Sequence, residues 1–471
     1  MSDAPLPPPA GLFDRALRRI RGVWHDMATG IGVTADADDS VAAQMRACLD
    51  GRGGEVSARN RAAKLAETYL ARDAAGRAEF LRDLAGFDAD LQAVAVAYER
   101  VVAAPDAAAR AVAAAALRQA LEPPRIRLLT QFTSIPDGMK FLVDLRASLL
   151  AMRKSDPLLA ALESDLRSLL ASWFDVSFLE LACVDWNSPA ALLERLAGYE
   201  AVHSIRSWRD LKNRLDSDRR CYAFFHPRMP SEPLIFVEVA LVQGLADSVQ
   251  RLLDQRAPAL DPRAADTAIF YSISNCQRGL AGISFGNFLI KRVVELLGQE
   301  FRNIKAYATL SPIPGFRRWL DGRLAADDAV LTEEESSALR AAMPTADTGA
   351  AALSAILATR GFQRDPVLAP AVEPVLVRLA ARYLLVESAP ARGEGRAGRA
   401  LDPVAHFHLT NGARIERLDW LGDTSEKGVK ESATLMVNYL YDPARIEAHH
   451  EDYVGSGKRA ASSAVRRLVR G

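Results

Sequence analysis

The stretch that decides the fold is TAIFYSISNCQRGLAGISFGNFLIKRVVELLGQEFRNIKAYATLSPIPGF, residues 267–316. Its first segment, Thr267–Ser274, is rich in β-branched and aromatic residues and predicts a strand. A glycine-rich turn follows, and the spacing of apolar residues beyond Asn287 predicts a helix. Ile304–Leu310 predicts a second strand, which Pro312 should end because proline cannot donate to a strand ladder. The order strand, turn, helix, strand indicates a sheet covered by helices.

The glycines of the turn favour the binding of an anion. Gly279, Gly282 and Gly286 stand between a predicted strand and a predicted helix N-terminus, where backbone N–H groups can point at a phosphate. The spacing is not G-x-G-x-x-G and no G-K-[ST] follows, which excludes the dinucleotide fingerprint and the P-loop. The segment Gln277–Gly282 is similar to the Q/R-x-x-G-x-G/A loop with which GNAT acyltransferases hold the pyrophosphate of coenzyme A. We therefore expect a phosphate-bearing ligand, with Ser311 one strand away.

The same turn contains a formal G-x-S-x-G motif, Gly282-Ile283-Ser284-Phe285-Gly286. In α/β-hydrolases this motif lies directly at a strand-to-helix turn and exposes the serine. Here several residues separate the motif from the end of the predicted strand. A serine hydrolase that uses Ser284 stays open as an alternative, as does a turn whose glycines only permit close packing.

Longer motifs resemble malonyl-CoA decarboxylase, in the order of that family, from about residue 182 to about residue 441. The motifs are YSIS at 271–274, GNFLIK at 286–291, LSPIPGF at 310–316 and DPVAHFHLTNGA at 402–413. The resemblance implies decarboxylation of malonyl-CoA to acetyl-CoA and carbon dioxide in fatty-acid and malonate metabolism. It also implies no metal, biotin or pyridoxal phosphate, because the thioester itself accepts the electrons.

The resemblance further implies a two-domain α+β fold. Residues 1–176 should form an all-α helical bundle for scaffolding or self-association, and residues 177–471 a GNAT-like mixed-sheet domain that binds acyl-CoA. In that sheet two neighbouring strands splay apart and the thioester enters between them. The residues themselves agree, because helical periodicity from about 58 to 172 gives way to alternating strands and helices. Additional strands are predicted at Arg220–Phe225, Leu234–Val242 and Arg414–Trp420, and a helical insertion at 321–362 with a capping box at Thr332–Glu335.

The implied reaction needs donors aimed at the thioester oxygen and an acid that protonates the carbon of the resulting enolate. The resemblance maps the catalytic histidine onto His408, as proton donor; an unperturbed imidazole titrates near pH ~6.5, which suits that role. It maps the catalytic serine onto Ser311, a second polar position onto Ser272, and a tyrosine that orients the histidine onto Tyr441. The apolar stretch around His406 and His408 reads as a strand, in which both imidazoles would share a face.

The implied CoA loop covers most of the glycine-rich turn. Some relatives carry an acidic residue where this chain has Ser284, so the group that does that residue's work here is open. The loop positions are Gly279, Ala281, Gly282, Ile283, Ser284, Phe285, Gly286 and Asn287.

Composition narrows the possible partners and compartments. Lys+Arg and Asp+Glu are both 59, so the chain lacks the basic excess of proteins that bind nucleic acid or anionic membranes. No apolar run is long enough to span a bilayer. The four cysteines are scattered without zinc spacing, which fits a reducing compartment. We expect a cytoplasmic homo-oligomer, a tetramer or dimer of dimers; a GNAT-type acyltransferase and a non-enzymatic helical scaffold are the remaining alternatives.

Overall fold

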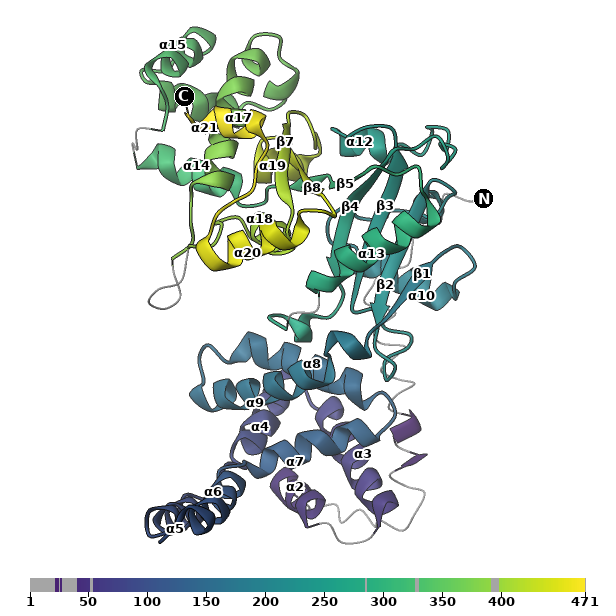
Figure 1. Cartoon of the computed structure of the whole chain (residues 1–471), viewed down its shortest axis with the longest axis vertical. Helices are drawn as coiled ribbons and strands as arrows, with labels where there is room; N and C mark the ends of the chain where they lie inside the picture. The colour runs from purple at the N-terminus through teal and green to yellow at the C-terminus, as the bar shows by residue number, and fades with distance from the viewer. Residues whose placement is uncertain are drawn as a thin grey trace.

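The computed structural model describes residues 22–24, 26–27, 40–50, 54–283, 286–326, 330–390 and 398–470. A helical part comes first and a sheet flanked by helices follows, which confirms the predicted α+β class (Figure 1). Alanine- and leucine-rich segments form the first part, whose larger apolar side chains make up a buried core. Its helices are α2 (Val41–Leu49), α3 (Glu55–Ala71), α4 (Ala74–Ala85), α5 (Leu91–Val102), α6 (Ala107–Ala120), α7 (Pro124–Gln131), α8 (Gly138–Met152) and α9 (Pro157–Trp173), with a 3-10 turn at Phe132–Ser134.

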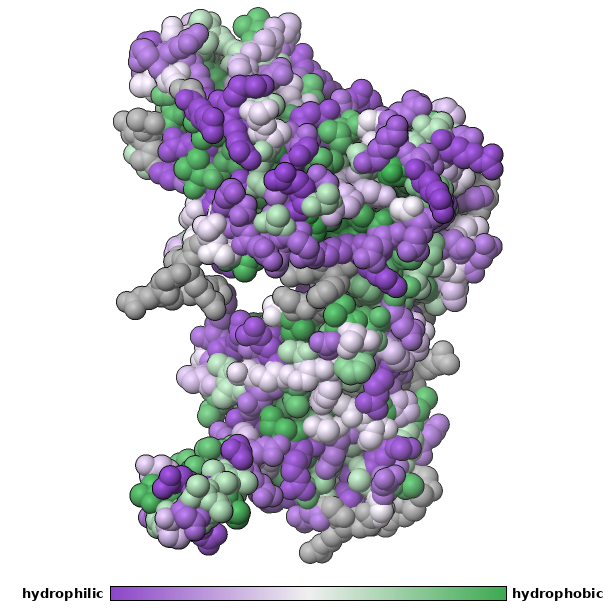
Figure 2. All heavy atoms as spheres, in the orientation of Figure 1, coloured by the Kyte–Doolittle hydropathy of each residue, from purple (hydrophilic) through white to green (hydrophobic). Residues whose placement is uncertain are grey.

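Helices α5 and α6 pack on each other as a hairpin that stands out from the rest of the helical part (Figure 1). Leu91 and Tyr98 belong to the stretch from about 58 to 172 whose periodicity predicts helices, and a helix forms here. However, Leu91 is 80% exposed and Tyr98 is 59% exposed. Figure 2 shows several hydrophobic side chains on the surface of this hairpin. The apolar residues of α5 therefore do not all face a core made by their own chain.

The second part is built on one mixed sheet of eight strands with the order β1-β2-β3-β4-β5-β8-β6, and β7 also pairs with β8. Among the strand pairs of the described ranges, β4–β5 is parallel, and the other pairs are antiparallel. Five of the six predicted strands are present within a few residues of their expected bounds, and the sixth, around His406 and His408, is a helix. Strands β1, β6 and β8 were not predicted. The strands are β1 (Glu180–Val184), β2 (Arg219–Phe225), β3 (Ile235–Val242), β4 (Thr267–Asn275), β5 (Ala306–Thr309), β6 (Ser311–Pro312), β7 (Arg414–Asp419) and β8 (Met436–Tyr441).

Strands β4 and β5 part halfway along β4. Their last paired residues are Phe270 and Thr309, and the N–H of Leu310 still donates to the Phe270 carbonyl at 3.1 Å. Beyond this point β4 continues to Asn275 along β3 alone, while the chain after β5 turns into β6 and pairs with β8. This is the divergence of neighbouring strands that the resemblance implied.

As the sequence predicts, strand pairing ends at Pro312, but Pro312 itself still takes part in it. Ser311 and Pro312 form the short strand β6, opposite Val437 and Met436 of β8. Proline lacks only the N–H donor, so it can occupy an edge position where that donor is not needed. The β6–β8 pairing fixes Ser311 against β8.

Helices pack on the sheet and its extensions (Figure 1). The predicted apolar face of α13 is confirmed, since Leu289, Val293 and Leu297 are fully buried. The predicted insertion forms α15 and α16, and the Thr332–Glu335 capping box is present. None of the helices in the described ranges is long and apolar enough to cross a bilayer. The helices are α10 (Ala190–Tyr199), α11 (Trp208–Asn213), α12 (Val249–Leu252), α13 (Gly286–Glu300), α14 (Phe316–Ala325), α15 (Glu333–Ala342), α16 (Gly349–Ala358), α17 (Leu368–Leu385), α18 (Pro403–Thr410), α19 (Glu426–Ser432), α20 (Ile446–Ser456) and α21 (Ser463–Arg470), with 3-10 turns at Val176–Phe178, Arg278–Leu280 and Phe362–Arg364.

Candidate active site

Three of the predicted site residues lie together in the interior. Nε2 of His408 lies 3.1 Å from Oγ of Ser311, and Nδ1 of the same ring lies 2.7 Å from the Tyr441 hydroxyl. Oγ of Ser311 donates a hydrogen bond of 2.8 Å to Oγ1 of Thr309. All four side chains are buried. We call this connected set, Tyr441, His408, Ser311 and Thr309, the His408 network.

The histidine is carried by helix α18, and the predicted strand at this position is wrong. Asp402 caps the helix by accepting from the N–H groups of Val404 and Ala405, and Pro403 occupies the first turn, where its missing N–H costs nothing. Residues two apart lie on different sides of a helix. His406 therefore points away from His408 and bonds to the Tyr453 hydroxyl at 2.8 Å.

The end of α18 is closed by a Schellman motif, which fixes the turn that contains His408. The N–H of Ala413 donates to the His408 carbonyl, and the N–H of Gly412 donates to the Leu409 carbonyl, both at 3.0 Å. Gly412 has a φ of 79°, in the left-handed region that glycine tolerates best. The pair Asn411-Gly412 is itself a strong turn signal in the sequence, and the chain turns there.

Strand β8 supplies two further contacts that sequence reasoning missed. The ring of Tyr439 stacks on His408 with centroids 4.4 Å apart and planes at 24°, and its N–H donates to Oγ1 of Thr309 at 3.2 Å. Tyr439 and Tyr441 are two residues apart and share a face of β8. A strand prediction for 436–441 would have placed both tyrosines beside the histidine.

Burial determines which protons the His408 network carries. Removal from water lowers the pKa of His408 to about 3 and raises the pKa of Tyr441 well above its usual value. The imidazole is therefore neutral near pH 7, contrary to the expectation of titration near pH ~6.5. Because Ser311 gives its hydroxyl proton to Thr309, the imidazole proton lies on Nε2 and points at Ser311. Nδ1 then accepts from the Tyr441 hydroxyl, which keeps its proton.

A pH titration by NMR tests this assignment. Among the seven histidines, the Cε1–H resonance that is missing in His408→Asn should not move between pH 8 and pH 5, because burial holds that imidazole neutral. The unfolded chain binds the proton below pH ~6.5 and the folded chain does not, so this group should also lower stability as the pH falls. A midpoint near pH 6.5 for that resonance would contradict the assignment.

Ser272 lies apart from the His408 network, on β4 directly beyond the parting from β5. It donates to Glu200 at 2.6 Å and lies 3.3 Å from Oγ of Ser274. The other oxygen of Glu200 accepts from the N–H groups of Val202 and His203, both at 2.8 Å. Across the described ranges, no hydrogen bond joins Ser272 to the His408 network. Glu200 was missed because a single carboxylate after a helix carries no local signal.

The predicted CoA loop is only partly open to a ligand. The N–H groups of Leu280, Ala281 and Ile283 donate to carbonyls within the turn, at 3.0 to 3.1 Å, so they are not free for an anion. Gly282 has a φ of 76°, and among the described residues no atom other than those of its chain neighbours lies within 4 Å of the position that its Cβ would take. Gly286 and Asn287 begin α13, whose first N–H groups have no partner within the helix. Ser284 and Phe285 lie outside the described residues.

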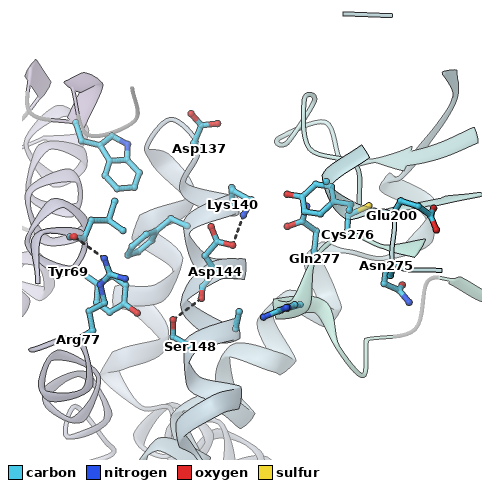
Figure 3. Close-up of a pocket in the computed structure, with 18 residues that line it drawn as sticks. Tyr69, Arg77, Asp137, Lys140, Asp144, Ser148, Glu200, Asn275, Cys276 and Gln277 are labelled. Carbon is cyan, nitrogen blue, oxygen red and sulfur yellow. Dashed lines mark hydrogen bonds and ion pairs between the residues drawn. The ribbon is translucent and has the colours of Figure 1, made fainter. Parts of the chain in front are cut away.

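A cavity of about 620 Å³ lies between the helical part and the end of β4 (Figure 3). Figure 3 shows Lys140 and Asp144 on α8, facing Gln277 and Glu200 across the open space. Lys140 pairs with Asp144 at 2.5 Å. The cavity thus extends from the glycine-rich turn to the carboxylate that holds Ser272. Within the described ranges, no three His, Cys, Asp or Glu side chains gather as a metal site requires.

The sequence matches two family profiles: the malonyl-CoA decarboxylase C-terminal domain over residues 177–471 and the malonyl-CoA decarboxylase N-terminal domain over residues 87–174. The mitochondrial malonyl-CoA decarboxylase of Rattus norvegicus is 37% identical over 414 residues, which cover 84% of this chain and 82% of the relative. The corresponding protein of Anser anser anser is 38% identical over 357 residues, covering 74% of this chain and 69% of the relative.

Solved structures with the same fold carry the same name. The malonyl-CoA decarboxylase from Rhodopseudomonas palustris has a TM-score of 0.81 and 42% identity, covering 91% of this chain and 98% of that one. The protein from Agrobacterium vitis has a TM-score of 0.81 and 39% identity, covering 91% and 99%. The family profiles, the curated relatives and the solved structures agree, and the chain belongs to the malonyl-CoA decarboxylase family.

Proposed function

We propose that this chain decarboxylates malonyl-CoA to acetyl-CoA and carbon dioxide. The observation that carries the proposal is the position of the His408 network in a chain of this family. Ser311 lies directly after the point where β5 leaves β4, and the histidine reaches it from α18. An acyl group that enters between the parted strands would therefore meet an imidazole N–H and a hydroxyl in a dry environment, where donors act most strongly.

The proposed step breaks the bond between the carboxylate carbon and the methylene carbon of the malonyl group. The electron pair moves onto the thioester, which becomes an enolate, and carbon dioxide leaves. His408 then gives a proton to the enolate carbon. Although the free imidazole is neutral, a bound malonyl carboxylate favours its charged form, because an opposite charge nearby raises the pKa of a histidine. The negative charge of the malonyl carboxylate becomes the charge of the enolate. The one proton that the imidazole takes up is given to the enolate carbon, so the charges balance.

Product analysis tests the activity. The purified protein with malonyl-CoA should release carbon dioxide and form acetyl-CoA in equal amounts, with no free CoA thiol. Thiol release that depends on an added amine would favour an acyltransferase instead. Labelling by a fluorophosphonate that Ser284→Ala abolishes would favour a serine hydrolase. Neither thiol release nor labelling is expected here.

We further propose that residues 279–287 bind the pyrophosphate of CoA through the Gly282 N–H and the first turn of α13. The left-handed Gly282 and the open space beside it support this. Ser272 gives its proton to Glu200, so it would serve the substrate as an acceptor, for example from an amide N–H of the pantetheine arm.

The division into a helical domain, 1–176, and a catalytic domain, 177–471, stays a proposal, supported by the matched ranges of the two family profiles. A homo-oligomer, tetramer or dimer of dimers, is supported by the exposed apolar residues of α5 and α6. Light scattering should then give a multiple of the 51.2 kDa chain mass. A cytoplasmic location is supported by four unpaired cysteines.

A further inference from the structure

We propose that Arg146, in helix α8 of the helical part, is a positioning residue for the CoA-binding turn. The inference rests on the proposed function of that turn. It goes beyond that function by making the helical part a contributor to the ligand site, where sequence reasoning had predicted only scaffolding or self-association.

The side chain of Arg146 connects the two parts of the protein. Its guanidinium donates to the carbonyl of Gly279 at 2.5 Å and to the carbonyl of Ala281 at 2.9 Å. Its Nε donates to Glu163 of α9 at 3.0 Å, and that carboxylate also pairs with Arg153 at 2.5 Å. Arg146 is only 2% exposed. A buried guanidinium fixed by a carboxylate on one side holds its remaining donors in a rigid geometry.

Helix α8 lies directly against the turn. A Cβ at Gly279 would fall 1.7 Å from the carbonyl oxygen of Val143, which is one helical turn before Arg146. Only glycine permits this approach. The first glycine of the predicted phosphate loop is therefore a contact point for the helical part, and its close packing brings Arg146 within reach of the turn.

Holding the carbonyls fixes the direction of the amide that faces the ligand. In a trans peptide the C=O and the N–H point in opposite directions. Because Arg146 holds the Ala281 carbonyl toward α8, the N–H of Gly282 in the same peptide points away from α8. Arg167 of α9 lies 3.4 Å from the Gly282 carbonyl and favours the same orientation of the next peptide. Without Arg146, a peptide of this turn can rotate and present a carbonyl to the phosphate, which would repel it.

The test compares Arg146→Gln and Arg146→Lys with the unchanged protein. The KM for malonyl-CoA and the calorimetric Kd for CoA should each rise by about tenfold or more, while kcat changes by less than about threefold. We expect KM and Kd to change while kcat does not, because no residue of the His408 network contacts Arg146. Lysine keeps the charge beside Glu163 but lacks the fork that reaches two carbonyls, so it should restore folding without restoring affinity.

Arg125→Gln is the matched control. Arg125 is also a buried arginine of the helical part, bonded to Asp165 at 2.6 Å and to the Ala85 carbonyl at 2.8 Å. It should lower stability without changing the Kd for CoA. The inference is overturned if both Arg146 variants keep the wild-type Kd, or if Arg125→Gln raises it equally. If both Arg146 variants raise the Kd for CoA but the wild type releases no carbon dioxide, the proposed activity is refuted and this inference stands.

Discussion

Replacing His408 by asparagine should lower kcat for malonyl-CoA by ~100-fold or more, because the enolate carbon loses its proton donor. Ser311→Ala should lower kcat by ~10-fold to 100-fold, because the imidazole loses the hydroxyl that its Nε2–H faces at 3.1 Å. Both substitutions lie away from the proposed pyrophosphate contacts, so the Kd for CoA should change little. Release of carbon dioxide under saturating substrate gives kcat, and calorimetry with CoA gives the Kd.

His406→Asn is the matched control for the histidine. It lies in the same helix and its ring bonds to a tyrosine hydroxyl, that of Tyr453, at 2.8 Å, but it is outside the His408 network. Ser432→Ala is the control for the serine, since Ser432 is equally buried and donates to the Leu435 carbonyl at 2.7 Å. Both controls should keep kcat within a few-fold of wild type. Wild-type turnover in His408→Asn would exclude the proposed role of the imidazole.

Gly412→Ala should lower the free energy of unfolding by about 3 kcal/mol or more. Two costs add at this position. A residue with a Cβ is strained at a φ of 79°, and that Cβ would fall 2.2 Å from the carbonyl oxygen of Ile446 in α20. Urea unfolding followed by circular dichroism measures the change. Since Gly412 closes the helix that carries His408, kcat should fall as well.

Gly322→Ala provides the comparison for this measurement. Gly322 lies inside α14, its backbone is not left-handed, and nothing lies within 4 Å of an added Cβ. Alanine is the better helix former, so this substitution should stabilise the protein by about 0.5–1 kcal/mol. A Gly412→Ala protein as stable as wild type would show that the Schellman motif does not hold α18 in the way the structure indicates.

Local sequence patterns were sufficient to predict the central strand of the sheet and the helix that follows it. The β-branched run at Thr267–Ser274 and the apolar stripe beyond Asn287 are strong periodic signals, and both elements form where predicted. The family motifs also placed His408, Ser311 and Tyr441, which the structure brings together. The strand and the helix could be predicted because each depends on neighbours within a few positions of the chain. The roles of His408, Ser311 and Tyr441 stay predictions.

Features that depend on distant contacts were not predictable. Ser311 and Pro312 form a strand only because β8 pairs with them. The lowered pKa of the His408 imidazole follows from its complete burial, which a sequence motif does not reveal. Arg146 lies in a helix rich in leucine and alanine, and its two carbonyl partners are more than a hundred positions away in the chain. The helix of His408 is different, because Asp402-Pro403 is a helix-start signal that the strand prediction overlooked.

A structure of this protein with acetyl-CoA bound is the most direct test of the proposed site. We expect an acetyl carbon within about 3.5 Å of Nε2 of His408 or Oγ of Ser311, and a pyrophosphate at the Gly282 N–H and the first turn of α13. An acyl end outside the His408 network, or a pyrophosphate away from residues 279–287, would contradict it.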